Sequence, residues 1–497
     1  MLTLQSILCC IVVILLLTLY YFIRRQYSFW RTQGVVYERP WFPFGNLGFL
    51  MRKSFPEFFR ELSIKYKCDY VGIFMGWKPT LVIQSPELAQ QILVQDYHYF
   101  RDRHLYSGYS DPIGAYNLFT LKGQLWRDMR NELTPIFTSS KLKSITEWCN
   151  LSATELVMKI QRDHIEGNKA VNTRELFAMY ISDNIAFTVF GIRESALNGE
   201  DSPMWQLTQH IVTWNFWRGL EFFLIFFLPG IASLFRLKVF SEQGSQYIKK
   251  MFWNVVDERR RRGFKDSKDL VNILLQLRGK YNDESNPEFA DDLMIAQAAV
   301  FILGAVDTSS TVLSYCLHEL SHHPDVQEKL FREIEAAMHK KQEKVLDYVA
   351  LLELKYLTAC INETMRKDTP IAELDRICIE DYKLNDDLVI TKGTPVLVNT
   401  LAIHHNEKYY PEPNEWRPER FYGKVHSNQH FLAFGDGQRN CIGKRYAYMQ
   451  MRAALVQIIY NYKVLPGMPY EVKSHPYSIT LALYNGGIVK FVLRSEN

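Results

Sequence analysis

The feature that most constrains this chain is a cysteine in a glycine-rich loop, just before a long helical pattern. The loop reads Phe434-Gly435-Asp436-Gly437-Gln438-Arg439-Asn440-Cys441-Ile442-Gly443. A helix start carries partial positive charge and unpaired amides, which favours a thiolate at Cys441. Gly437 and Gly443 let the backbone pass close to a large flat group, and Arg439 adds a cation. This combination predicts a haem, with Cys441 as axial iron ligand and Arg439 near an acidic propionate.

The same loop resembles the haem-binding segment of the cytochrome P450 family, Phe-x-x-Gly-x-Arg-x-Cys-x-Gly. All five fixed positions are present, as Phe434, Gly437, Arg439, Cys441 and Gly443. A lone cysteine ahead of a helix is usually an inert hydrophobe, but the glycines and the arginine argue against that here. The resemblance implies a mainly α-helical fold with a smaller β-sheet portion near both ends. It also implies haem b as the cofactor and a monooxygenase activity.

The composition is that of an ordinary globular protein, with 497 residues, 47% hydrophobic and 23% charged. No Pro/Gly/Ser-rich linker interrupts residues 49–497, so one large domain is expected there. The net charge of +4 is too small to indicate nucleic acid as a partner. The eight cysteines are scattered without a CxxC pair, which argues against a disulfide scaffold and indicates a reducing compartment.

The N-terminus has the features of a membrane anchor. Leu2 to Ile23 is mostly apolar and uncharged, and a helix of that length spans about 33 Å, enough to cross a bilayer core. Arg24 and Arg25 follow, which places the N-terminus in the lumen and the body in the cytosol. A cleaved signal peptide would need a basic n-region and a small-residue cleavage site, and both are missing.

The expected parts are a membrane anchor at 1–23, a basic, proline-rich hinge at 24–48 and a catalytic domain at 49–497. The hinge resembles that of microsomal family members, so we expect the endoplasmic reticulum membrane.

A second apolar run, from Phe222 to Pro229, is too short to span a membrane. It has two interpretations. The run packs in the core, or it forms a patch that dips into the bilayer near a substrate entrance, as the resemblance favours.

Asp291 to Ser321 reads as one long helix that is apolar nearly all round, which predicts a buried position. A polar interruption, Gly304-Ala305-Val306-Asp307-Thr308-Ser309, lies in its middle. It resembles the family's oxygen-activating motif, with Ala305 in place of the usual second glycine. We therefore predict Thr308 and Asp307 as catalytic residues, Thr308 hydrogen-bonding dioxygen and Asp307 connecting it to solvent protons. A helix kink stabilised by a hydroxyl is the simpler alternative.

Two further motifs resemble the family's scaffold. Glu363 and Arg366 lie on one helix face, and the resemblance implies that Arg420 joins them in a buried network behind the haem loop. The next residues, Lys367 and Asp368, depart from the family, which usually has apolar residues and prolines there. These two charges are either solvated or mark an unusual edge of the site.

Three more residues are predicted to surround the haem. Trp126 and Arg130 are one helical turn apart, so Arg130 can pair with a propionate while Trp126 packs beside it. Arg376 lies ten residues beyond Arg366, where the family often places another propionate partner.

Two rival hypotheses remain. His318-Glu319-Leu320-Ser321-His322 matches HExxH, the zinc-protease helix, although Pro324 ends the helix at once. Alternatively the chain is a haem-thiolate isomerase or a relative that only binds ligands, although the intact pair of Asp307 and Thr308 favours oxygen activation.

The resemblance also implies partners and substrates. Electrons come from NADPH through NADPH-cytochrome P450 reductase, with cytochrome b5 as an optional second donor. The reductase would dock on a basic set made of Arg127, Lys141, Lys143, Lys444 and Arg445. Phe100-Arg101-Asp102-Arg103 resembles insect members, which implies a lipophilic small-molecule substrate, in xenobiotic (insecticide) or endogenous hormone metabolism.

Overall fold

The computed structural model describes residues 4–47, 53–108, 110–167, 169–199, 202–261, 270–282, 286–342, 345–423 and 430–494. The expected boundary between hinge and catalytic domain, at 48/49, lies outside these residues. The described helices are α1 (Leu4–Tyr27), α2 (Phe29–Thr32), α3 (Phe55–Lys65), α4 (Pro86–Gln90), α5 (Pro112–Ala115), α6 (Gly123–Leu133), α7 (Ser139–Ile160), α8 (Thr173–Ile185), α9 (Pro203–Val212), α10 (Phe216–Phe227), α11 (Pro229–Leu234), α12 (Glu242–Arg261), α13 (Leu270–Lys280), α14 (Pro287–His322), α15 (Pro324–Lys341), α16 (Tyr348–Glu353), α17 (Lys355–Lys367), α18 (Thr400–His404) and α19 (Lys444–Asn461). The described strands are β1 (Tyr70–Met75), β2 (Lys78–Ile83), β3 (Val171–Asn172), β4 (Glu373–Ile377), β5 (Tyr382–Lys383), β6 (Val389–Ile390), β7 (Pro395–Asn399), β8 (Tyr462–Pro466) and β9 (Ile488–Leu493).

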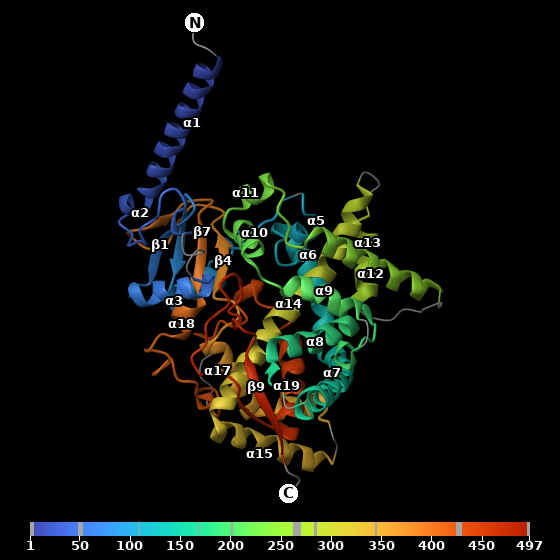
Figure 1. The fold of residues 1–497 in the computed structure, drawn as a ribbon. Helices are drawn as coiled ribbons and strands as arrows, with labels where there is room; N and C mark the ends of the chain where they lie inside the picture. The colour runs from blue at the N-terminus through green and yellow to red at the C-terminus, as the bar shows by residue number, and fades with distance from the viewer. Residues whose placement is uncertain are drawn as a thin grey trace.

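The expected mainly helical fold with a smaller β portion is confirmed, and α14 is its central element (Figure 1). The helix was predicted over residues 291–321 and runs over Pro287–His322. Ile302 and Val306 in its middle are fully buried, and the helix packs against α8, α13 and α17. It ends where Pro324 follows, because the residue before a proline is disfavoured in helical geometry.

A four-stranded sheet in the order β1-β2-β7-β4 forms one β-rich part. β1 and β2 form an antiparallel hairpin, and β2 runs parallel to β7. β4 is antiparallel to β7, with Glu373 opposite Asn399 and Arg376 opposite Val396. The strand order puts β4 at one edge of the sheet, and residues of β4 line the large cavity described below.

The anchor helix α1 projects away from the rest of the molecule in Figure 1. Its apolar side chains are mostly exposed, and its length and hydropathy make it a candidate membrane span. α14 is also long and apolar enough to span a membrane, but it is a core helix. α1 continues to Tyr27, beyond the predicted end at Ile23, so the first residues of the expected hinge are helical. The helix is held at its base, because the Tyr27 hydroxyl donates to the Pro43 carbonyl at 2.9 Å and Trp30 is buried.

The apolar run from Phe222 to Pro229 packs mainly inside the molecule. Phe223 and Phe227 of α10 are buried and contact the ring of Phe55. Exposed apolar side chains come directly after the run instead, at Leu234 and Phe235, which are 76% and 68% exposed. The core interpretation therefore holds for the run itself, and an apolar patch lies on the adjoining α11.

Candidate active site

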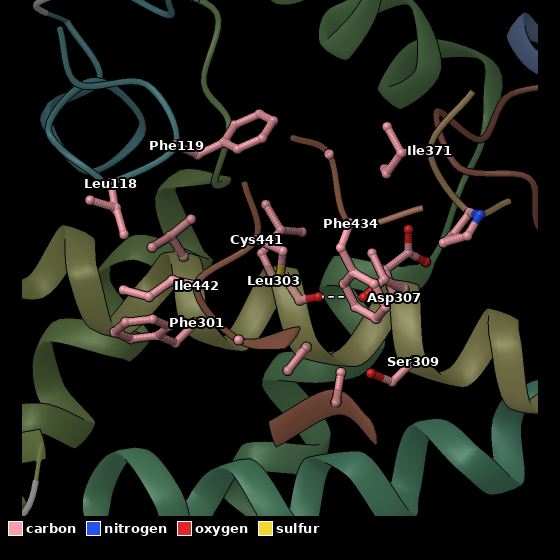
Figure 2. A pocket seen from close by; sticks show the side chains of 18 of the residues that line it. Leu118, Phe119, Phe301, Leu303, Asp307, Ser309, Ile371, Phe434, Cys441 and Ile442 are labelled. Carbon is pink, nitrogen blue, oxygen red and sulfur yellow. Dashed lines mark hydrogen bonds between the residues drawn. The ribbon is translucent and has the colours of Figure 1, made fainter. Parts of the chain in front are cut away.

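A cavity of about 340 Å³ lies between the Cys441 loop and α14. Figure 2 shows side chains that line it, among them Leu118, Phe119, Phe301, Leu303, Asp307, Ile371, Phe434, Cys441 and Ile442. Most of this lining is apolar. Cys441 is exposed and lines this cavity, so a group bound there can reach its thiol. The geometry therefore offers a sulfur ligand to a group bound inside.

Burial of the Cys441 side chain opposes formation of the thiolate that the sequence favours. Its backbone N–H donates to the Phe434 carbonyl at 2.8 Å, which closes the loop. Burial raises the pKa of the Cys441 thiol, while the Gly443 amide, Arg130 and Lys444 act in the opposite direction. The Gly443 amide and these cations favour the thiolate, and a bound metal ion would favour it further.

The two loop glycines have different roles. Gly437 has φ of +66°, and a Cβ there would lie 2.1 Å from the Leu93 carbonyl oxygen. The absence of a side chain at Gly437 allows the loop to contact the helical segment Gln91–Gln95. We expected the backbone at Gly437 to lie against a cofactor, but Gly437 does not line the cavity. Gly443 does line the cavity, and a Cβ there would meet nothing within 4 Å. Space for a flat group is therefore present over Gly443.

α14 brings the predicted catalytic pair to the opposite wall. Thr308 Oγ1 donates to the Gly304 carbonyl at 2.6 Å, as in the simpler kink interpretation, and both residues line the cavity. Asp307 is buried, and both of its carboxylate oxygens are held. Arg174 Nη2 lies 2.6 Å from one, and Thr480 Oγ1 donates to the other at 2.8 Å.

The predicted propionate partners gather at one end of the cavity. Arg130, Arg376 and Arg439 all line it, as does Trp126. The Trp126 ring lies 3.9 Å from the Arg439 guanidinium, so it packs on Arg439 rather than beside Arg130 as expected. Arg130 bonds the Cys441 loop itself, through the carbonyl of Asn440 at 2.9 Å.

Two nitrogen atoms of this arginine cluster have no hydrogen-bond partner in the described part of the chain, although Arg439 Nη2 pairs with Asp102 at 3.2 Å. Arg439 Nη1 and Arg376 Nε are buried without a hydrogen-bond partner. Burial lowers the pKa of Arg376 to about 9 and that of Arg439 to about 10, and the neighbouring Arg103 adds to both effects. Unpaired buried donors and excess positive charge favour an anionic ligand. Together with the thiol and the space over Gly443, they fit a haem with its carboxylates at the arginines.

A buried ionic network fixes the loop from behind. Glu363 bonds Arg366 at 2.8 Å and Arg420 at 3.1 Å, and Glu363 and Arg366 are fully buried. Arg366 also donates to the carbonyl of His404 at 2.9 Å. The His404 ring nitrogen Nε2 accepts from the Leu432 amide at 2.8 Å, two residues before Phe434. The network thus connects α17 and α18 to the start of the Cys441 loop.

The HExxH segment makes other contacts. Glu319 bonds Lys367 Nζ at 2.5 Å and accepts from the Tyr470 hydroxyl at 3.0 Å, and His318 Nε2 donates to the Tyr470 carbonyl at 3.0 Å. Within the described ranges no three His, Cys, Asp or Glu side chains could hold a metal ion. The zinc-protease hypothesis is therefore wrong, and the segment fastens the chain around Tyr470 to α14.

The same contacts explain the departure at Lys367 and Asp368. Burial acts to lower the pKa of Lys367, but the charges of Asp368 and Glu319 outweigh burial and raise this pKa. Asp368 is 9% exposed and lies 3.8 Å from Arg60. These charges are neither solvated nor at the cavity wall, but form ion pairs behind it.

Three residues at the site, Arg174, Thr480 and Glu373, belong to no motif that the sequence shows. Arg174 and Thr480 hold Asp307 from positions 133 and 173 residues away. Glu373 lines the cavity with a carboxyl oxygen that has no partner. Only the folded chain brings these side chains to the site.

A mainly helical fold with a cysteine facing an apolar cavity, an arginine cluster at its end and a polar break in the facing helix defines a haem-thiolate oxygenase. The cytochrome P450 family model matches residues 36–484, and the chain belongs to this family. It is 33% identical to "Cytochrome P450 6j1" of Blattella germanica, over 96% of this chain and 95% of that protein. It is 32% identical to "Cytochrome P450 6a2" of Drosophila melanogaster, over 93% of this chain and 94% of that protein. The chain is thus a haem-dependent monooxygenase that resembles insect members, as predicted.

Proposed function

We propose that the cofactor is haem b, held by Cys441 as the axial iron ligand. Arg130, Arg376 and Arg439 bind its carboxylates, and Trp126 supports Arg439. Phe434 and Gly443 shape the wall next to the ring, and Gly437 supports the loop from outside. When bound, the haem supplies the activation of dioxygen that no amino-acid side chain provides. The observation that carries this proposal is the Cys441 thiol facing a cavity in which Arg439 Nη1 and Arg376 Nε have no hydrogen-bond partner among the residues that the structure describes.

The residues of α14 control protons in this proposal. The Thr308 hydroxyl donates to the Gly304 carbonyl, and a rotation about χ1 turns it toward the cavity. Arg174 and Thr480 each bind one carboxylate oxygen of Asp307 and so orient it. Asp307 then accepts protons from the Arg174 side, which is near the surface, and passes them toward Thr308.

The substrate is a lipophilic small molecule, because the wall is largely apolar and excludes charged groups that lack a partner. Its oxidation serves the metabolism of xenobiotics such as insecticides, or of an endogenous hormone. Electrons come from NADPH through NADPH-cytochrome P450 reductase, with cytochrome b5 as a second donor. The exposed cations Lys143, Lys444 and Arg445 support a docking face for an acidic flavoprotein.

The protein resides in the endoplasmic reticulum membrane with its catalytic domain in the cytosol. The exposed apolar helix α1, followed by Arg24 and Arg25, supports this orientation. Exposed Trp217, Leu234 and Phe235 support a second contact with the lipid bilayer.

The test is the absorption spectrum of the ferrous carbon-monoxide complex. Thiolate ligation shifts the Soret band strongly to the red, and we expect that band in the full chain. Cys441→Ser should lose it, whereas Cys378→Ser, which changes a buried cysteine of the β-rich part, should keep it. A wild-type spectrum without the red-shifted band in folded protein would refute the proposed site.

A further inference from the structure

One carboxyl oxygen in the cavity wall has no hydrogen-bond partner among the described residues. Glu373 is the first residue of β4, lines the cavity and is 7% exposed. Its Oε2 atom receives no hydrogen bond. Buried polar atoms are normally paired, so an unpaired carboxyl oxygen in a cavity wall indicates a missing donor. Asp307 differs in this respect, because Arg174 and Thr480 occupy its oxygens.

The charges around Glu373 do not supply that donor. The charge of Arg103 acts on Glu373, but Arg103 Nη1 is bound to Asp375 at 2.5 Å. Asp375 also accepts from the backbone amide of His104 at 2.8 Å. Burial raises the pKa of Glu373 well above its usual range, the Asp375 charge adds to this, and Arg103 opposes it. Burial thus favours the neutral form of Glu373, and a cation that enters the cavity favours the ionised form.

We propose that Glu373 determines substrate class by binding the protonated nitrogen of a lipophilic amine. This inference rests on the proposed function of the cavity as a substrate site. A charged N–H is the strongest donor for a carboxyl oxygen, and the hydrogen bond between them is stronger than one between neutral groups. The hydrocarbon part of the amine packs on apolar side chains such as Phe119 and Ile371, which line the same cavity. Neutral lipophiles still bind there but leave Glu373 unpaired.

The experiment compares two ligands of equal shape on the full-length holoenzyme. One is a phenyl-substituted N-methylpiperidine, and the other is the methylcyclohexane with the same phenyl group. Equilibrium dialysis near neutral pH measures both dissociation constants. We expect the wild-type protein to bind the amine about tenfold or more tightly than its carbon analogue, the range of a charged hydrogen bond.

The variants are Glu373→Gln, which keeps the shape and removes the charge, and Glu373→Leu, which removes the polar group. Both should lose the amine preference and bind the carbon analogue within about twofold of wild type, because apolar burial is unchanged. Glu132→Gln is the matched control, since Glu132 pairs with Lys280 on the surface. The carbon-monoxide spectrum verifies that each variant is folded and holds haem.

Three results would overturn the inference. The first is equal binding of both ligands by the wild type. The second is an amine preference that survives in Glu373→Gln or Glu373→Leu, including one caused by nitrogen ligation of iron, which the Soret band reveals. In both cases the carbon analogue still binds, so the proposed function of the cavity stands. The third is binding of neither ligand by any variant, and this result refutes the lipophilic substrate site as well.

Discussion

At the scale of single residues, Asp307 shows how a buried acid is kept in one orientation. Its two oxygens are bound by an arginine of α8 and a threonine near the C-terminus, so three distant segments meet at one carboxylate. These contacts form one buried hydrogen-bond network that holds the Asp307 carboxyl in place. Proton transfer then depends on Arg174 and Thr480 as much as on Asp307.

Removing the acid should uncouple electron use from product formation. Asp307→Asn keeps the shape and the Thr480 bond but cannot accept a proton, and we expect product per NADPH to fall by about 10²-fold. NADPH oxidation, hydrogen peroxide release and product are measured together. Asp291→Asn, at a surface ion pair of the same helix, is the control. Unchanged coupling in Asp307→Asn would contradict a role in proton delivery.

A buried histidine should make the fold sensitive to acid. Burial lowers the pKa of His104 to about 4, and Lys78 adds to this effect. The unfolded chain, with a histidine pKa of about 6.5, binds this proton more tightly, so stability falls as pH drops from about 6.5 to about 4. The linkage is worth up to about 3 kcal/mol. His104→Gln should lose that part of the pH dependence in denaturant titrations. A parallel pH profile for variant and wild type would contradict it.

Residue identities at the site were more predictable than their contacts. Cys441, Thr308 and Arg439 belong to dense local patterns, and the structure places all three at one cavity. The stacking of Trp126 on Arg439 and the contact of Gly437 with Leu93 depend on how α6 and the loop meet in space. Local spacing carries no information about such tertiary contacts.

At the scale of elements, the network around Glu363 determines where the Cys441 loop begins. Arg366 spans from Glu363 to the carbonyl of His404, and the His404 ring holds the Leu432 amide. α17 and α18 therefore position the loop before any cofactor contact is made.

Breaking this network should destabilise the whole catalytic part. Glu363→Gln leaves Arg366 and Arg420 buried without a counter-charge, which costs about 3–5 kcal/mol. Denaturant titration measures the loss, and the haem-to-protein ratio should fall with it. Glu61→Gln, at an exposed ion pair of α3, should change stability by less than about 1 kcal/mol. Equal effects of the two substitutions would contradict the role of the network.

Long periodic elements were predictable, and their ends were less so. The apolar pattern placed α14 within a few residues, because burial on all sides leaves a clear signal. The sequence does not predict the end of α1 correctly, because Arg24 and Arg25 lie inside the helix, which ends at Tyr27. Contacts of Tyr27 and Trp30 with the body extend the helix past them.

At the scale of the whole molecule, the basic face should govern electron delivery. Reversing the charges of Lys444 and Arg445 to Glu should slow haem reduction by the reductase about tenfold at low salt, with a smaller effect at high salt. Stopped-flow reduction measures this. The same reversal at Lys383 and Lys392, exposed cations of the β5–β6 region, should leave the rate unchanged. Identical rates in both double variants would exclude docking at this face.

Membrane attachment should survive loss of the anchor. A chain lacking residues 1–25 keeps the exposed Trp217, Leu234 and Phe235, so it should still bind phospholipid vesicles, measured by co-sedimentation. Adding Leu234→Ser and Phe235→Ser should abolish most of that binding. A truncated protein that remains fully in solution would show that α11 does not contact lipid.

The base of α1 has a mechanical consequence. A Cβ at Gly72 would lie 2.5 Å from the Trp30 ring, and Trp30 Nε1 donates to the Ile73 carbonyl at 3.0 Å, so the stem of the anchor is locked onto the first strand of the sheet. Such a joint transmits torque instead of swivelling. The direction of α1 therefore fixes the orientation of the sheet, and any tilt of this helix turns the rest of the molecule with it.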